Sequence, residues 1–69
     1  MTLRQAQNQA RTQAKRTGKP WYVLDLRGLD EPAGDYAYAN EFDLATFYSG
    51  LDRRIVSEYT GAAAEGGVA

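Results

Sequence analysis

The chain contains no cysteine and no histidine among its 69 residues. Zinc sites built on these residues, thiol catalysis and disulfide cross-links are therefore excluded. A domain of this length buries only about 60% of the surface that its unfolded chain exposes, so its core is thin. Since no disulfide or zinc ion can reinforce that core, a second copy of the chain is one remaining source of buried surface. We therefore expect a homodimer.

Long apolar runs are also missing from the sequence. No segment approaches the ~20 consecutive apolar residues that a membrane-spanning helix needs. The N-terminus is polar and rich in glutamine, without the apolar centre of a signal peptide. With 43% hydrophobic and 25% charged residues, the composition is that of an ordinary globular chain. The sequence therefore predicts one small domain with no membrane partner.

Acidic residues are missing from the first part of the chain. Residues 1–19 carry five basic side chains and no acid, whereas residues 20–69 carry nine acids against three arginines. Such asymmetry can mark a surface for nucleic acid or another partner. It is also what a basic helix beside an acidic sheet would produce within one domain. The candidate basic residues are Arg4, Arg11, Lys15 and Arg16, of which the first three share one face of a helix.

Both ends of an N-terminal helix are signalled over residues 3–16. Thr2 and Gln5 have the spacing of a capping box. Gly18 suits the left-handed position that follows a helix, and Pro20 stands just beyond it. The apolar positions of this helix form one narrow stripe made mostly of methyl groups: Leu3, Ala6, Ala10 and Ala14. This stripe buries little area but permits close approach to a sheet.

Residues 21–27 are the most apolar run and the best candidate for a strand. Side-chain alternation turns Tyr22, Leu24 and Leu26 toward the core and Trp21 and Val23 toward the other face. Residues 28–34 contain two glycines and a proline and form a loop. Residues 35–41 then return as the second strand of a hairpin. We expect Leu26 to face Tyr36, Leu24 to face Tyr38 and Tyr22 to face Asn40, although the long loop does not fix this register.

Asp43 is predicted to cap a short helix over residues 44–48, with Phe42 and Phe47 spaced as a hydrophobic staple. Residues 54–60 are rich in β-formers and favour a third strand. The apolar residues between positions 44 and 59 also fit one face of a continuous helix. The predicted fold is α+β in the order αββαβ, an N-terminal helix on a small antiparallel sheet, with αββα as the alternative. The domain spans residues 1–60, and residues 61–69 are expected to form a flexible tail.

Catalytic and metal-binding patterns are absent from the sequence. Without histidine or cysteine, a general base would have to be a carboxylate, lysine or tyrosine. Asp30, Glu31 and Asp35 cluster in the loop but match no calcium-binding spacing. Glycines 28 and 34 flank acids, which would repel phosphate. We therefore expect no enzyme activity, no metal and no cofactor.

Three segments together resemble small accessory proteins encoded by bacteriophages. These are the Gln/Ala/Arg helix, the run Thr17-Gly18-Lys19-Pro20-Trp21-Tyr22-Val23-Leu24, and the run Phe42-Asp43-Leu44-Ala45-Thr46-Phe47-Tyr48-Ser49-Gly50 followed by a closing Ile-Val segment. The resemblance covers about residues 2–60 and assigns no site residue. It implies a role in binding and inhibiting a host or defence protein, such as a CRISPR complex, in the cytoplasm of the bacterial host.

The leading functional hypothesis is a non-enzymatic module that binds a protein through the sheet face opposite the predicted core. That face would present Trp21 and Val23 beside the small Ala37 and Ala39. An acidic rim would steer it to a basic partner: Asp25, Asp30, Glu31, Asp35 and Glu41. Alternatively, the short helix covers Trp21 through Phe47 and Tyr48 and makes a second core. The second functional hypothesis is nucleic-acid binding through the basic helix.

Overall fold

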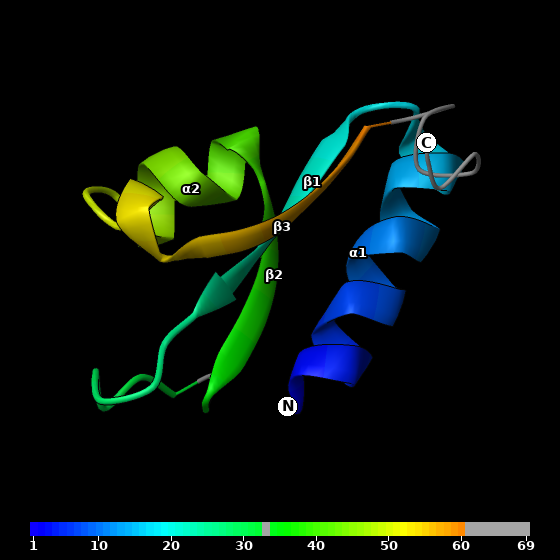
Figure 1. Ribbon diagram of the computed structural model, residues 1–69. Helices are drawn as coiled ribbons and strands as arrows, with labels where there is room; N and C mark the ends of the chain where they lie inside the picture. The colour runs from blue at the N-terminus through cyan, green and yellow to red at the C-terminus, as the bar shows by residue number, and fades with distance from the viewer. Residues whose placement is uncertain (33, 61–69) are drawn as a thin grey trace.

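The computed structural model describes residues 1–32 and 34–60 of the chain. Its elements are helix α1 (Leu3–Thr17), strands β1 (Pro20–Asp25) and β2 (Tyr36–Asn40), helix α2 (Glu41–Phe47), a single 3-10 turn η1 (Asp52–Arg54) and strand β3 (Ile55–Thr60) (Figure 1). The predicted α+β fold with the order αββαβ is confirmed. The alternative with a long C-terminal helix is wrong, because β-branched and aromatic residues draw 55–60 into the sheet. The predicted tail, residues 61–69, lies outside the described residues.

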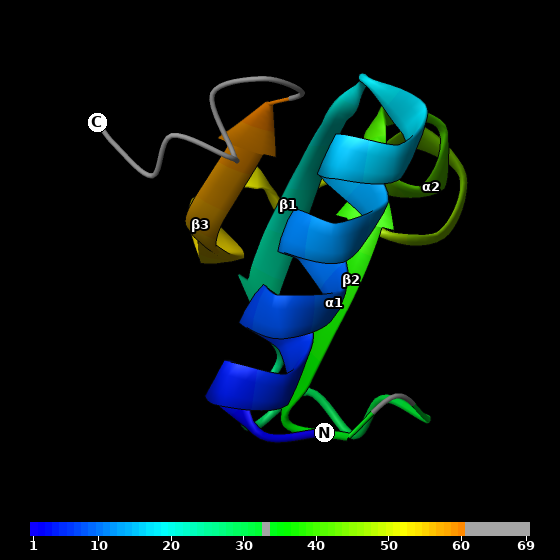
Figure 2. The same ribbon diagram turned by 90° about the vertical axis from the view of Figure 1, so that its right-hand side faces the viewer.

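The three strands form an antiparallel sheet in the order β2-β1-β3, with β1 at its centre. Helix α1 lies along one face of this sheet and α2 lies on the other (Figures 1 and 2). The chain therefore has three layers. Because both faces of β1 are covered, Val23 and Leu24 are each fully buried although they point to opposite faces.

The predicted boundaries of α1 are confirmed to within one residue. The backbone N–H of Gln5 donates to Thr2 Oγ1 at 3.1 Å, and Gln5 Oε1 accepts from the Thr2 N–H at 2.9 Å. At the other end Gly18 adopts φ 70°, a left-handed conformation that glycine reaches without steric cost. Its N–H donates to the carbonyl of Ala14 and closes the last turn.

The alanine stripe of α1 is completely buried against the sheet. Ala6, Ala10 and Ala14 have no exposed surface, and the first two share a buried cluster with Val23 of β1. The ring-bearing residues Trp21, Tyr36, Tyr38 and Tyr59 surround this cluster. Since the stripe is used within the chain, the predicted homodimer would have to form through another surface.

The hairpin register differs from the prediction by one residue. Leu24 pairs with Ala37, and Val23 pairs with Tyr38, whereas the sequence argument paired Leu24 with Tyr38. A one-residue slip exchanges the two faces of a strand, so Tyr36 and Tyr38 lie on the α1 face. The physical reason is a complementarity of size. Tyrosine rings fill the space beside the alanines of α1, and Ala37 and Ala39 leave room for the larger side chains of the α2 layer.

The core on the α2 face consists of Leu24, Leu26, Ala37 and Ala39, with Leu29, Leu44, Tyr48, Leu51 and Ile55 packed against it. The prediction that Leu24 and Leu26 are core residues is confirmed. The prediction that Val23 lies on a face outside the core is wrong, because α1 covers that face and buries Val23. Tyr48 contributes to this core rather than to a cover over Trp21, so the predicted second core under the short helix is also wrong.

Helix α2 begins three residues earlier than predicted. Asn40 is its N-cap, and its side-chain oxygen accepts from the Asp43 N–H at 2.7 Å. Asp43 is therefore the third helical residue, and its carboxylate accepts from the Asn40 N–H at 3.5 Å. Asn40 can start the helix directly from β2 because both elements need the extended backbone that an N-cap has. The predicted staple is wrong, since Phe42 and Phe47 are 71% and 69% exposed.

Candidate functional site

The four residues of the predicted binding face do not lie on one surface. Trp21 and Val23 belong to the α1 face, while Ala37 and Ala39 belong to the α2 face. Val23, Ala37 and Ala39 are all buried, so no partner can reach them. Only Trp21 keeps partial exposure. The proposed flat patch is thus corrected to a single accessible residue, and the surroundings of that residue define the candidate site.

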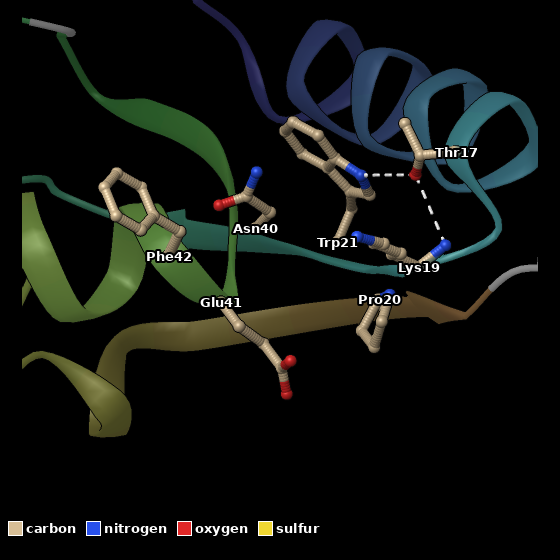
Figure 3. Close-up of a pocket in the computed structure, with 7 residues that line it drawn as sticks. All are labelled: Thr17, Lys19, Pro20, Trp21, Asn40, Glu41 and Phe42. Atoms are coloured by element: carbon tan, nitrogen blue, oxygen red, sulfur yellow. Dashed lines mark hydrogen bonds between the residues drawn. The ribbon is translucent and has the colours of Figure 1, made fainter.

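Trp21 lines a groove of about 570 Å³ between the α1–β1 turn and the β2–α2 junction. Thr17, Lys19 and Pro20 belong to the same wall as Trp21, and Asn40, Glu41 and Phe42 come from the junction (Figure 3). The two walls meet because Trp21 pairs directly with Asn40 at this end of the sheet. We refer to these seven residues as the Trp21 groove.

The indole of Trp21 is held by Thr17, the last residue of α1. Trp21 Nε1 donates to Thr17 Oγ1 at 3.1 Å, and that hydroxyl in turn donates to the carbonyl of Gln13 at 2.8 Å. The Lys19 N–H also points to Thr17 Oγ1, at 3.3 Å (Figure 3). On its other side the indole packs against Tyr38, with ring centroids 5.7 Å apart. These contacts fix the ring before any ligand arrives.

The opposite wall is the first turn of α2. Asn40 and Asp43 cap this turn reciprocally, which sets the direction in which Glu41 and Phe42 leave the sheet. Phe42 is 71% exposed, the largest exposure among the large apolar residues that the structure describes. Figure 3 shows its ring on the far side of Asn40 from Trp21. The groove therefore has one fixed aromatic ring and one solvent-exposed aromatic ring.

The polar groups around the groove are of both signs. Lys19 supplies a positive charge from one wall and Glu41 a negative charge from the other. Burial raises the pKa of the neighbouring Tyr22, and the carboxylates of Glu41 and Glu58 raise it further, so this phenol stays neutral. Such an arrangement can bind a ligand with both polar and apolar parts. It contains no nucleophile with an adjacent base.

The predicted acidic rim is not brought together around the groove. Of its five members, only Glu41 lines it. Asp25 lies at the other end of β1, where its carboxylate bonds Arg27 at 2.8 Å and 3.0 Å. This contact lowers the pKa of Asp25 to about 2. Asp30, Glu31 and Asp35 lie in the connection between β1 and β2. No group of three acidic side chains within residues 1–32 and 34–60 is arranged to hold a metal ion.

The basic residues of α1 form a separate surface. Arg4, Arg11, Lys15 and Arg16 are all exposed on this helix. The guanidinium of Arg11 lies over the ring of Tyr59 at 5.4 Å from its centroid. This surface therefore contacts β3 through Arg11, and it lies on the opposite side of the sheet from α2 (Figure 1).

Sequence reasoning missed Phe42, Asn40 and Thr17 as members of a site. The staple spacing assigned Phe42 to the interior, and no pattern in the sequence links residue 17 to residue 42. The one usable signal was Asn40, which is as good an N-cap as Asp43 and would have placed Phe42 in the first turn. The groove itself depends on the register of β1 and β2.

No protein-family model, curated protein or solved structure matches this chain. Within the part of the chain that the structure describes, no helix has the length and apolar character needed to cross a bilayer.

Proposed function

We propose that this protein is a non-enzymatic module that binds another protein through α2 and the Trp21 groove. One observation carries the proposal: both phenylalanines of the chain are on the surface, although its core is thin. Phenylalanine is ordinarily among the most buried residue types. Burying one such side chain contributes about 1.5–3 kcal/mol. A protein partner that covers Phe42 and Phe47 would recover this free energy.

The groove supports the same proposal through its rigidity. Trp21 is already held by Thr17 and Tyr38, so a partner does not have to order it. Interfaces draw most of their affinity from a few aromatic or arginine side chains in desolvated pockets. Phe42 at the rim and Trp21 within the groove have this character. The Lys19 and Glu41 charges at the same rim can select a partner with matching polar groups.

The resemblance to bacteriophage accessory proteins supplies the class of partner. We propose a host or defence protein of a bacterium, which this chain inhibits by occupying one of its surfaces. The chemistry required of the partner is an apolar projection or pocket for the two phenylalanines. No catalytic step is assigned to this chain.

The test is affinity capture from bacterial lysate with quantitative mass spectrometry, using the full chain as bait. Phe42→Ser and Phe47→Ser are compared with Val56→Ser, which removes another exposed apolar side chain, one that is 50% exposed on β3. We expect a specific protein that the unaltered chain and Val56→Ser retain and that at least one phenylalanine variant loses. A purified pair should then show at least a tenfold weaker affinity, which corresponds to about 1.4 kcal/mol.

The three positions are exposed, so each variant should keep the circular dichroism spectrum of the parent chain. A partner retained equally by all three variants would show that the interface lies elsewhere. Failure to enrich any protein over a bead control would contradict the proposal directly.

A further inference from the structure

The orientation of α1 is fixed by its buried alanines, and this determines what its outer surface presents. Ala6, Ala10 and Ala14 face the sheet, so Asn8 and Thr12 lie on the opposite side of the helix. Figure 2 shows this outer side of α1 toward the viewer. Arg4, Arg11 and Lys15 lie on one flank of the exposed ridge, and Arg16 lies on the other. The ridge itself is uncharged and carries an amide and a hydroxyl group.

The charge of this surface is of one sign along the whole helix. Helix α1 contains four basic residues and no acid, and Lys19 follows just after its C-cap, Gly18. The layer on the opposite side of the sheet is different, because α2 contains Glu41 and Asp43 and no basic residue. The two helices that cover the sheet thus carry opposite charge. A net charge of −1 for the chain conceals this separation.

Contacts to β3 hold the more basic flank in place. Gln7 Nε2 donates to Ser57 Oγ at 2.9 Å, which joins the middle of α1 to the edge of the sheet. One turn further on, the Arg11 guanidinium stacks over Tyr59. A guanidinium held against an aromatic face loses less rotamer entropy when it meets an anion.

We propose that the outer face of α1 is a binding surface for duplex DNA, with the helix lying in the major groove. An α-helix with side chains is about 10–12 Å across, and the major groove is about 12 Å wide. Arg4 and Lys15 are separated by about 16 Å along the helix axis at 1.5 Å per residue. Cations on both flanks of an uncharged ridge match a groove bordered by two rows of phosphates. Duplex DNA presents such rows on the two sides of its major groove, so it fits this charge pattern.

The probe is a fluorescein-labelled 20-base-pair DNA duplex, with binding by the full chain followed as fluorescence anisotropy. Three phosphate contacts, from Arg4 and Arg11 on one flank and Arg16 on the other, predict a slope of about −2.7 in a plot of log affinity against log salt concentration. The affinity should then fall about 40-fold between 50 and 200 mM salt. The reversal of two charges, Arg4→Glu with Arg11→Glu, should abolish binding.

Arg4→Gln and Arg53→Gln form a matched pair for this test. Both remove one positive charge from an exposed arginine, but Arg53 belongs to η1 beside α2 (Figure 1). Arg4→Gln should reduce the steepness of the salt slope by about 0.9, whereas Arg53→Gln should leave it unchanged. Equal weakening by both variants would show a general effect of net charge and overturn the assignment to α1.

Three other results would also overturn the proposal. The first is the absence of DNA binding at 50 mM salt. The second is competition by polyglutamate as effective as that by unlabelled duplex DNA, which would assign the surface to acidic proteins instead. The third concerns RNA. A double-stranded RNA of the same sequence should bind more weakly, because its major groove is too narrow to admit a helix. Equal binding of RNA would place α1 across the phosphates and contradict the groove geometry.

Discussion

Helix α1 packs on the central strand through fully buried alanines, and replacement of Ala10 by leucine tests this packing directly. Ala10 has no exposed surface, and it shares a buried cluster with Ala6 and Val23, which are equally inaccessible. A leucine at this position adds three carbon atoms where the helix and the sheet already touch. The helix can accept it only by moving outward or by forcing Val23 from its rotamer.

Overpacking of this kind costs about 1–3 kcal/mol. A chain of this length has a total stability of about 3–10 kcal/mol, so the loss is a large fraction of it. If the free energy of unfolding falls by about 1 kcal/mol for each molar of urea, the urea concentration at the unfolding midpoint should fall by about 1–3 M. Asn8→Leu is the matched control, because it introduces the same side chain on the exposed side of the same helix. Its midpoint should stay the same or rise slightly, since leucine is the better helix former.

A double-mutant cycle identifies where the strain acts. Val23→Ala removes two methyl groups from the facing position and should cost about 2 kcal/mol by itself. Combined with Ala10→Leu, it opens the space that the leucine needs. The free energy of unfolding of the double variant should therefore fall by less than the sum of the two single losses, and the difference should be about 0.5–3 kcal/mol. Urea unfolding followed by far-ultraviolet circular dichroism measures all four proteins. If Ala10→Leu and Asn8→Leu have the same midpoint, the packing of α1 on β1 described above is wrong.

Three further predictions concern the other layers of the fold. Leu24→Ala should destabilise the chain by about 2–5 kcal/mol in urea unfolding, whereas Val56→Ala, at an exposed position of β3, should change it by less than about 0.5 kcal/mol. Asn40→Ala should cost about 0.5–2 kcal/mol through loss of the α2 cap, which a thermal melt would record as a decrease of several degrees; an unchanged melting temperature would refute the cap. The Asp25 carboxylate, with its pKa held at about 2, stabilises the folded chain above pH 4, and this contribution is lost as the pH falls toward 2. Melting temperatures of Asp25→Asn and the parent chain should therefore differ most above pH 5 and converge near pH 2, and a constant difference would contradict the Asp25–Arg27 contact.

The boundaries of α1 could be predicted from the sequence because the signals that start and end this helix are local. Thr2, Gln5 and Gly18 each act within four residues, and their effect does not depend on the rest of the chain. The alanine stripe also indicated a close approach to the sheet. The order of the elements followed from the same kind of local signal, since the β-formers of residues 55–60 outweighed their helical spacing.

The register of the hairpin could not be read from the sequence, because it depends on both faces of the sheet at once. A sheet with one buried and one solvated face would bring the larger side chains of both strands together on the buried face. In the structure, helices cover both faces of the sheet, and Tyr38 pairs with Val23 rather than with Leu24. The candidate site depends on the same register, because the pairing of Trp21 with Asn40 brings the two walls of the groove together.

The distribution of aromatic residues links the fold to the proposed interaction. Six of the eight rings belong to tryptophan or tyrosine, and five of these six, all but Tyr22, pack against the two cores while keeping part of their surface exposed. The two rings without a polar group, Phe42 and Phe47, are the ones left in water. Burial within the chain alone would favour the reverse arrangement, because phenylalanine gains most from leaving water. The exposed phenylalanines are therefore unexplained by the stability of this domain, and they are the residues that the proposed protein-binding surface would use.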